Sequence, residues 1–166
     1  GNKNKMHLGS VTFFVALFIT FSQQLPPDTS ININSIAFGS CSGIRNRKTP
    51  IFEDIAKEEA DIWLWLGDVV YVDTRLAFNV FVNSPEEYVK EVYSKAKVEP
   101  FYQQMIGKFQ MLGVWDDHDF NQNNGNKSNP SKDWVQKIFL DHLDEPKDSP
   151  RWTRQGLYAS YVYGDA

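Results

Sequence analysis

Hydrophobic and polar positions along the chain follow two kinds of pattern. Short apolar runs at residues 33–38, 62–66 and 108–115 stop at small or acidic residues and predict β-strands. The middle run, IWLWL, contains no polar position, which is typical of a strand buried on both faces of a parallel sheet. Residues 156–164 alternate their side chains, are rich in Tyr, and predict a fourth strand.

Apolar positions with helical spacing lie between these runs. Thr49 and Pro50 are suited to the start of the first helix, and Ser84 with Glu87 has the spacing of a capping box. Ser131 precedes the last amphipathic stretch. Strands that alternate with helices indicate an α/β fold with a parallel sheet. The predicted helices cover residues 49–60, 84–96, 99–107 and 131–143.

The first 27 residues differ from the rest. Lys3 and Lys5 precede a nearly uncharged apolar run over residues 8–21, and a polar exit with two prolines follows. This run is shorter than the roughly 20 residues that cross a bilayer as a helix. We expect residues 1–27 to be a secretory signal peptide or an N-terminal membrane anchor, and the protein to be secreted or to lie in the lumen of the secretory pathway. An apolar helix packed on the fold is the alternative.

Composition limits the remaining choices. Hydrophobic residues make up 42% and charged residues 23% of the chain, as in a globular protein, so residues 28–166 are expected to form one domain. The net charge of −4 gives no basic field for a nucleic-acid backbone. Cys41 has no second cysteine to pair with, which excludes a disulfide within the chain.

Side chains that bind metals follow each of the first three predicted strands. In an open α/β sheet, ligands bind beyond the carboxyl ends of the strands, so these groups should converge on one edge. A cation between the carboxylates would offset their mutual repulsion. Two such ions can acidify a water molecule and hold a phosphoryl group, which indicates metal-assisted hydrolysis; Cys, Asp and Tyr together favour a transition metal such as iron. The groups are Ser40 and Cys41, then Asp68, Tyr71 and Asp73, and then Asp116 to Asp119.

Several of the candidate residues also have a purely structural interpretation. Cys41 can be a small buried apolar side chain, and Asp68 can close a turn. His142 lies on or beside the apolar face of the last predicted helix, which favours a core histidine. Arg45 can meet an anionic substrate or belong to a solvated basic loop. The Asn-rich stretch at residues 121–129 predicts a flexible loop.

Three sequence blocks together resemble one known family. FGSCS, IWLWLGDVVYVD and VWDDHDFNQNN, in this order and spacing, resemble the PhoD-like alkaline phosphatase and phosphodiesterase family of the calcineurin-like metallophosphoesterases. The resemblance covers about residues 35–164. It implies part of a four-layer α/β/β/α sandwich, hydrolysis of phosphomonoesters or phosphodiesters, and a site of two or three metal ions. Fe³⁺ with Ca²⁺ is the first expectation, and Mn²⁺ and Zn²⁺ are alternatives.

The resemblance also implies roles for individual residues. Cys41, Asp68 and Tyr71 match positions that bind iron, and Asp68 would bridge to a second metal. Asp117 falls on a metal-binding position, and His118 falls on the catalytic histidine that assists the phosphoryl group and its leaving oxygen. Residues expected around the metals or against the substrate are Asp116, Asp119, Asn124 and Arg45.

One departure from the family concerns the later metal ligands. Members continue well beyond this length, and their further His-containing blocks have no counterpart here, since no histidine follows His142. We therefore expect the N-terminal portion of a metallophosphoesterase, truncated at the C-terminus, whose own activity is incomplete. A non-catalytic fragment or splice form that acts as an interaction module is the alternative. A nuclease is a weaker hypothesis, because the acidic balance disfavours a polynucleotide groove.

Overall fold

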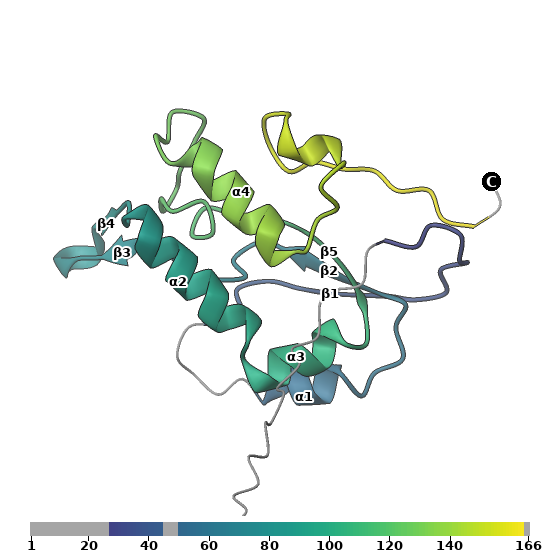
Figure 1. The fold of residues 1–166 in the computed structure, drawn as a ribbon. Helices are drawn as coiled ribbons and strands as arrows, with labels where there is room; N and C mark the ends of the chain where they lie inside the picture. The colour runs from purple at the N-terminus through teal and green to yellow at the C-terminus, as the bar shows by residue number, and fades with distance from the viewer. Residues whose placement is uncertain (1–26, 45–49, 165–166) are drawn as a thin grey trace, which may run out of the picture.

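A parallel sheet of three strands forms the centre of the fold. The structure, a computed structural model, describes residues 27–44 and 50–164. The strands β1 (Ile36–Gly39), β2 (Ile62–Leu66) and β5 (Gln110–Val114) lie in the order β1-β2-β5 (Figure 1). In the register, Leu64 pairs with Phe38 on one side and with Leu112 on the other. The α/β class and the first three predicted strands are confirmed, and β2 has its predicted bounds.

The described residues form four helices that pack around one face of this sheet, and all four were predicted from the sequence. Helix α1 stops at Ile55, short of the predicted end, because Lys57 and Glu58 donate their backbone N–H groups to carbonyls three residues earlier, which tightens the chain into a turn. Helices α1 and α3 lie together on one side of the sheet, and α2 packs on α4 (Figure 1). The helices are α1 (Ile51–Ile55), α2 (Glu86–Lys97), α3 (Pro100–Ile106) and α4 (Lys132–His142), with 3₁₀ turns at η1 (Ala77–Asn79) and η2 (Pro150–Trp152).

The two faces of the sheet have different surroundings. Trp63 and Trp65 point to the face covered by α1 and α3. There the Trp65 ring packs edge-on against the Phe52 ring and at a tilt against the Tyr102 ring. The alternate positions point the other way, as the strand period of two requires. On that second face, several apolar side chains stay exposed, so the prediction that β2 is buried on both faces holds only in part. The exposed residues are Ile36, Phe38, Leu66 and Val114.

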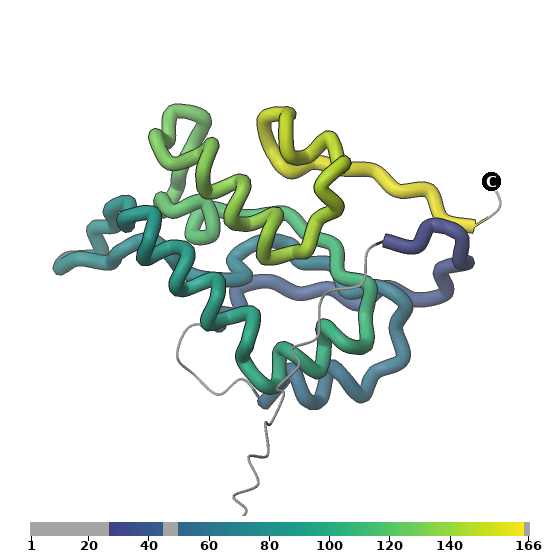
Figure 2. The backbone as a smooth tube through the Cα atoms, viewed as in Figure 1, coloured from purple at the N-terminus to yellow at the C-terminus, as the bar shows by residue number. Residues whose placement is uncertain are grey.

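The prediction of a strand at residues 156–164 is wrong. This segment runs extended across the second face without a strand partner, and buried Leu157 lines a cavity there together with Ile62 and Leu112. Its last backbone contact is the Gly164 N–H donated to the Thr29 carbonyl at 3.1 Å, so the two ends of the described chain lie side by side (Figure 2). The alternating pattern therefore reflects packing on a sheet face and not pairing with a sheet edge.

The predicted capping box at the start of α2 is also wrong. The Ser84 hydroxyl lies 2.7 Å from the Thr74 hydroxyl, and the Ser84 N–H donates to Asn121 Oδ1 at 2.8 Å. Glu87 pairs instead with Lys90 in the next turn. Ser131 likewise precedes α4 without a side-chain cap. Long-range partners have replaced the local bonds that the sequence spacing suggested.

A short antiparallel hairpin was not predicted. Strands β3 (Thr74–Arg75) and β4 (Phe81–Val82) project from the sheet beside the start of α2 (Figure 1). Each strand has two residues, which is too short for a hydrophobic period to show in the sequence. The hairpin begins directly after Asp73, at the end of the loop that follows β2.

His142 is a core histidine, as the sequence favoured. It is buried, its ring stacks parallel to the Tyr102 ring with centroids 5.6 Å apart, and its Nε2 lies 3.3 Å from the Tyr102 hydroxyl. Burial, with a smaller contribution from Lys97, lowers the pKa of His142 from 6.5 to about 3. The folded protein therefore holds this histidine neutral.

This neutral histidine makes stability depend on pH. Below about pH 6.5 the unfolded chain takes up a proton that folded His142 does not, so stability falls as the pH drops toward the folded pKa of about 3. We expect His142 alone to cost about 2 kcal/mol of unfolding free energy between pH 7 and pH 5. Urea unfolding at both pH values should show that the His142→Gln variant lacks this part of the loss; an equal loss in both proteins would contradict the assignment.

Parts of the predicted leader and two predicted residues lie outside the described chain. These are residues 1–26 of the expected signal peptide, the helix-start residue Thr49, and the candidate substrate residue Arg45. Across residues 27–44 and 50–164, no helix has the length and apolar character needed to cross a bilayer.

Candidate metal centre

Three loops meet at the carboxyl end of the sheet. The Cys41 N–H donates to the Gly67 carbonyl at 3.3 Å, which joins the loops after β1 and β2, and the Val72 N–H donates to the His118 carbonyl at 3.3 Å, which joins the loops after β2 and β5. Gly67 has a φ of 101°, and a Cβ there would lie 2.5 Å from Asp116 Cβ, so only glycine allows this approach. The predicted convergence of the three polar clusters is confirmed.

Five of the predicted site residues gather where these loops meet. Asp68, Asp117 and His118 each present one potential ligand atom, and these atoms lie within 4.8 Å of one another. Cys41 Sγ is 3.7 Å from Asp68 Oδ2, and the Tyr71 hydroxyl interacts with both Cys41 and Asp68. Residues far apart in the sequence thus form one cluster of thiol, phenol, carboxylate and imidazole groups.

Two residues of the cluster have an unusual backbone. Cys41 has a φ of 53° and Asp68 a φ of 51°, both in the left-handed region that is uncommon for residues other than Gly, and Asp adopts it more readily than Cys. Such a conformation costs on the order of 1–3 kcal/mol and persists only where surrounding contacts hold it. The bond from the Ser42 N–H to the Asp68 carbonyl at 3.0 Å is one of these contacts.

The Asp68 carboxylate favours a bound cation. It is buried, and its Oδ1 has no hydrogen-bond partner among the residues that the structure describes. Burial raises the pKa of Asp68, Tyr71 and His118 oppose this, and the charges of Asp117 and Asp116 raise the pKa further. A metal ion would supply the missing partner and offset the repulsion, so the donor set fits a metal.

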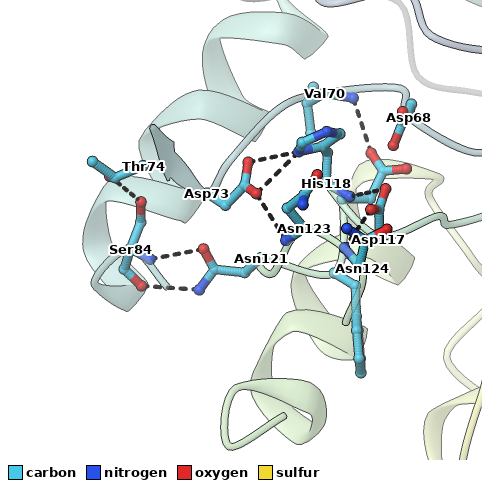
Figure 3. A network of polar contacts seen from close by, with 12 residues as sticks. Asp68, Val70, Asp73, Thr74, Ser84, Asp117, His118, Asn121, Asn123 and Asn124 are labelled. Carbon is cyan, nitrogen blue, oxygen red and sulfur yellow. Dashed lines mark hydrogen bonds and ion pairs between the residues drawn. The ribbon is translucent and has the colours of Figure 1, made fainter. Parts of the chain in front are cut away.

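His118 is held by a second carboxylate. Its Nδ1 lies 2.9 and 3.0 Å from the two oxygens of Asp73, which is buried and also accepts the Asn123 N–H at 2.9 Å (Figure 3). Burial lowers the pKa of His118, but the hydrogen bond and charge of Asp73, together with the charges of Asp117 and Asp68, outweigh it and the net pKa is raised. The Tyr71 and Phe81 rings flank the imidazole at 4.4 and 5.2 Å between centroids. The sequence predicted that Asp73 lies at this edge of the sheet but did not indicate that it orients His118.

Asp119 links the loop after β2 to the loop after β5 through hydrogen bonds to their backbone. Its buried carboxylate accepts the backbone N–H groups of Val70 at 2.9 Å, Val69 at 3.2 Å and Asp116 at 3.2 Å. Burial raises its pKa to about 7, against the effect of these hydrogen bonds. Asp119 therefore holds the loops that carry Asp68 and Asp117 together, while Asp116 itself is exposed.

Hydrogen bonds hold the Asn-rich segment at residues 121–129 in place, which differs from the flexible loop that the sequence predicted. Asn121 is fully buried, and its side chain accepts the Ser84 N–H at 2.8 Å and donates to the Ser84 carbonyl at 3.0 Å (Figure 3). Asn124 donates its backbone N–H to Asp117 Oδ2 at 2.6 Å. Amide side chains here fix the loop that presents Asp117 and His118, a role with no local sequence signal.

Comparisons with known proteins agree with the fold and with the sequence blocks. The family model described as PhoD-like phosphatase matches residues 36–143. A solved structure titled "Structure of PhoD" is similar with a TM-score of 0.61 and 19% identity, over 84% of this chain and 31% of that chain. This chain thus spans less than a third of the length of that structure, and at this identity the likeness concerns the fold. No curated protein matches. Because the family model matches well over half of the sequence, the chain belongs to the PhoD-like phosphatase family.

Proposed function

We propose that the protein is a metal-dependent phosphoric ester hydrolase of the alkaline phosphatase or phosphodiesterase type. The observation that carries this proposal is the cluster at the sheet edge. There a buried Asp68 oxygen, which has no hydrogen-bond partner in the described part of the chain, lies among Asp117, His118, Cys41 and Tyr71. Membership of the PhoD-like family supports the same chemistry. The substrate class is therefore a phosphate ester.

Cys41, Asp68, Tyr71 and Asp117 would hold the metal ions. Thiolate and phenolate donors suit Fe³⁺, and the carboxylates also suit Ca²⁺, so this pair is our first proposal, with Mn²⁺ and Zn²⁺ as alternatives. When bound, the ions polarise the phosphoryl oxygens and lower the pKa of a coordinated water molecule. The Asp119 carboxylate keeps the two ligand-bearing loops at a fixed separation through its three backbone bonds.

His118 would act as the general acid for the leaving oxygen. Asp73 accepts the Nδ1 proton, which leaves Nε2 as the nitrogen that holds and delivers a proton. Asp73 also fixes the orientation of the ring, as the partner of a catalytic imidazole should. Exposed Asp116 and Asn124 are proposed contacts for the ester, and so is Arg45, which lies outside the described residues.

The four-layer sandwich belongs to this proposal. Helices cover one face of the three-stranded sheet, and the opposite face presents Ile36, Phe38, Leu66 and Val114 to solvent. An exposed apolar face of this kind supports packing against a further layer. The secretory leader over residues 1–27 and the resulting location outside the cytosol remain predictions from the sequence.

Two aryl esters test the function and the type of ester together. Although the sequence predicts incomplete activity, the assembled cluster leads us to expect that the purified chain releases 4-nitrophenol from 4-nitrophenyl phosphate or bis(4-nitrophenyl) phosphate. It should lose this activity in a chelator and recover it when metal is returned. The ratio of the two rates assigns monoester or diester preference. A folded, metal-loaded chain that hydrolyses neither ester would contradict the proposal.

Asp73→Asn tests the orientation of His118. The amide retains the size of the side chain but removes the charge and one acceptor that hold Nδ1, so we expect kcat to fall roughly 10- to 100-fold while KM and metal content change little. Asp61→Asn is the control, because Asp61 also accepts two backbone N–H groups, from Asn34 and Ser35, but at the far end of β2. Equal losses in both variants would point to stability and not to His118.

A further inference from the structure

One motif in the Asn-rich segment has no part in the proposed function. Asn126, Lys127 and Ser128 form the triplet Asn-x-Ser, the acceptor for N-linked glycosylation when its middle residue is not proline. The same spacing recurs at Asn129 and Ser131, but Pro130 in the middle position excludes that triplet. No other Asn-x-Ser or Asn-x-Thr occurs in the sequence, so Asn126 is the single acceptor that the chain offers.

The folded loop exposes this triplet. Asn126, Lys127 and Ser128 are all exposed to solvent. Asn126 Oδ1 accepts the Ser128 N–H at 2.9 Å, which is an Asx turn, and the Asn126 carbonyl accepts the Asn129 N–H at 2.9 Å. Asn126 Nδ2 has no hydrogen-bond partner among the residues that the structure describes. The nitrogen that would carry a sugar therefore takes no part in holding the fold.

Two neighbouring asparagines use the same nitrogen inside the fold. Asn121 Nδ2 donates to the Ser84 carbonyl at 3.0 Å. Asn129 Nδ2 donates to the Phe120 carbonyl at 2.6 Å, and both asparagines are buried. A sugar on either of these nitrogens would break a buried hydrogen bond, which costs free energy of folding. A sugar on Asn126 breaks none.

The sequence also predicts the compartment that this modification needs. Residues 1–27 have the layout of a secretory signal peptide. Such a leader would carry the chain into the lumen of the secretory pathway, where Asn-x-Ser triplets in surface loops are glycosylated. The exposed triplet and the predicted leader thus agree with each other, although they lie in different parts of the sequence.

We propose that Asn126 carries an N-linked glycan. The donor is a lipid-linked oligosaccharyl diphosphate. Asn126 Nδ2 forms a bond to C1 of the first sugar, the bond from C1 to the diphosphate oxygen breaks, and the lipid diphosphate leaves while the nitrogen gives up one proton. Oδ1 is unchanged by this step, so the Asx turn with Ser128 persists. The bond from the Asn124 N–H to Asp117 Oδ2 at 2.6 Å also persists, so the glycan leaves the loop at the candidate metal centre intact.

Expression of the full chain with its own leader in a eukaryotic cell line tests the proposal. We expect peptide N-glycosidase to lower the apparent mass of the protein, and peptide mass spectrometry to locate the released glycan at Asn126. Asn126→Gln and Ser128→Ala should each abolish the mass change, whereas Ser128→Thr keeps the hydroxyl and should retain it. Asn34→Gln is the control, because Asn34 is exposed but lies outside any such triplet.

The outcomes are independent of hydrolysis. Cell lysate and medium are both analysed, so a variant that stays in the cell is still scored. A secreted chain whose mass is unchanged by peptide N-glycosidase would overturn the proposal, and so would a glycan that persists in Asn126→Gln. A chain that remains in the cytosol without a glycan would overturn it together with the predicted leader. Failure of the proposed phosphoesterase function would leave each of these results unaffected.

Discussion

Replacing Asp68 by Asn should abolish both metal binding and hydrolysis. Asn fills the same volume and tolerates the φ of 51° at this position, so the variant is expected to fold. It removes the buried charge that would meet a cation, at the residue that lies between Cys41 and the Asp117–His118 pair. Because bound metal supplies several kcal/mol of transition-state stabilisation, kcat/KM should fall by about 10³-fold or more. Elemental analysis and an aryl phosphate assay measure both effects.

The matched control is Asp144→Asn. Asp144 also has a left-handed backbone, with a φ of 48°. It follows α4, away from the sheet edge, and forms an ion pair with Lys97. This control separates the loss of a carboxylate at a positive φ from the loss of a metal ligand. Full metal content in Asp68→Asn would show that Asp68 is not a ligand, whatever happens to the rate.

Replacing His118 by Gln should lower kcat and leave the metal in place. Gln can still bond to Asp73, so the loop geometry is preserved, but it cannot deliver a proton at neutral pH. General acid catalysis contributes typically 10²- to 10⁴-fold, and we expect a loss in this range with little change in KM. Steady-state kinetics, with metal content measured on the same preparation, check the expectation.

His142→Gln is the control for this variant. It makes the same substitution at a histidine that packs on Tyr102 in the core, so it should change stability and not the rate. A loss of metal in His118→Gln would make His118 a ligand and not the acid. An unchanged kcat would remove it from the mechanism.

The sequence was sufficient to predict the sheet and the position of the cluster. The apolar runs before Gly39, Gly67 and Asp116 are local signals, and parallel strands bring their carboxyl ends to one edge. Cys41 and Asp68 could be placed together on that ground alone. Their left-handed backbone could not, because it depends on contacts between loops that are distant in the sequence.

The polar network behind the cluster was beyond sequence reasoning. The bond from Asp73 to His118 joins residues 45 positions apart, and Asn121 reaches Ser84 over 37 positions. Ser84 shows the physical reason most clearly. Its spacing to Glu87 suits a capping box, but burial beside Asn121 and Thr74 favours partners from other segments, and those contacts prevail. The hairpin was missed for a related reason, since its strands are stabilised by neighbours and not by a pattern of their own.

One titration tests the central claim most directly. The wild-type chain, stripped of metal by a chelator, is given increasing amounts of iron and calcium, and bound metal and 4-nitrophenyl phosphate turnover are measured on each sample. We predict that turnover is absent without metal and rises in proportion to the metal bound at the Asp68 cluster, with Asp68→Asn remaining empty and inactive. Turnover that persists after complete metal removal, or a folded chain that binds metal at this cluster and hydrolyses nothing, would contradict the account.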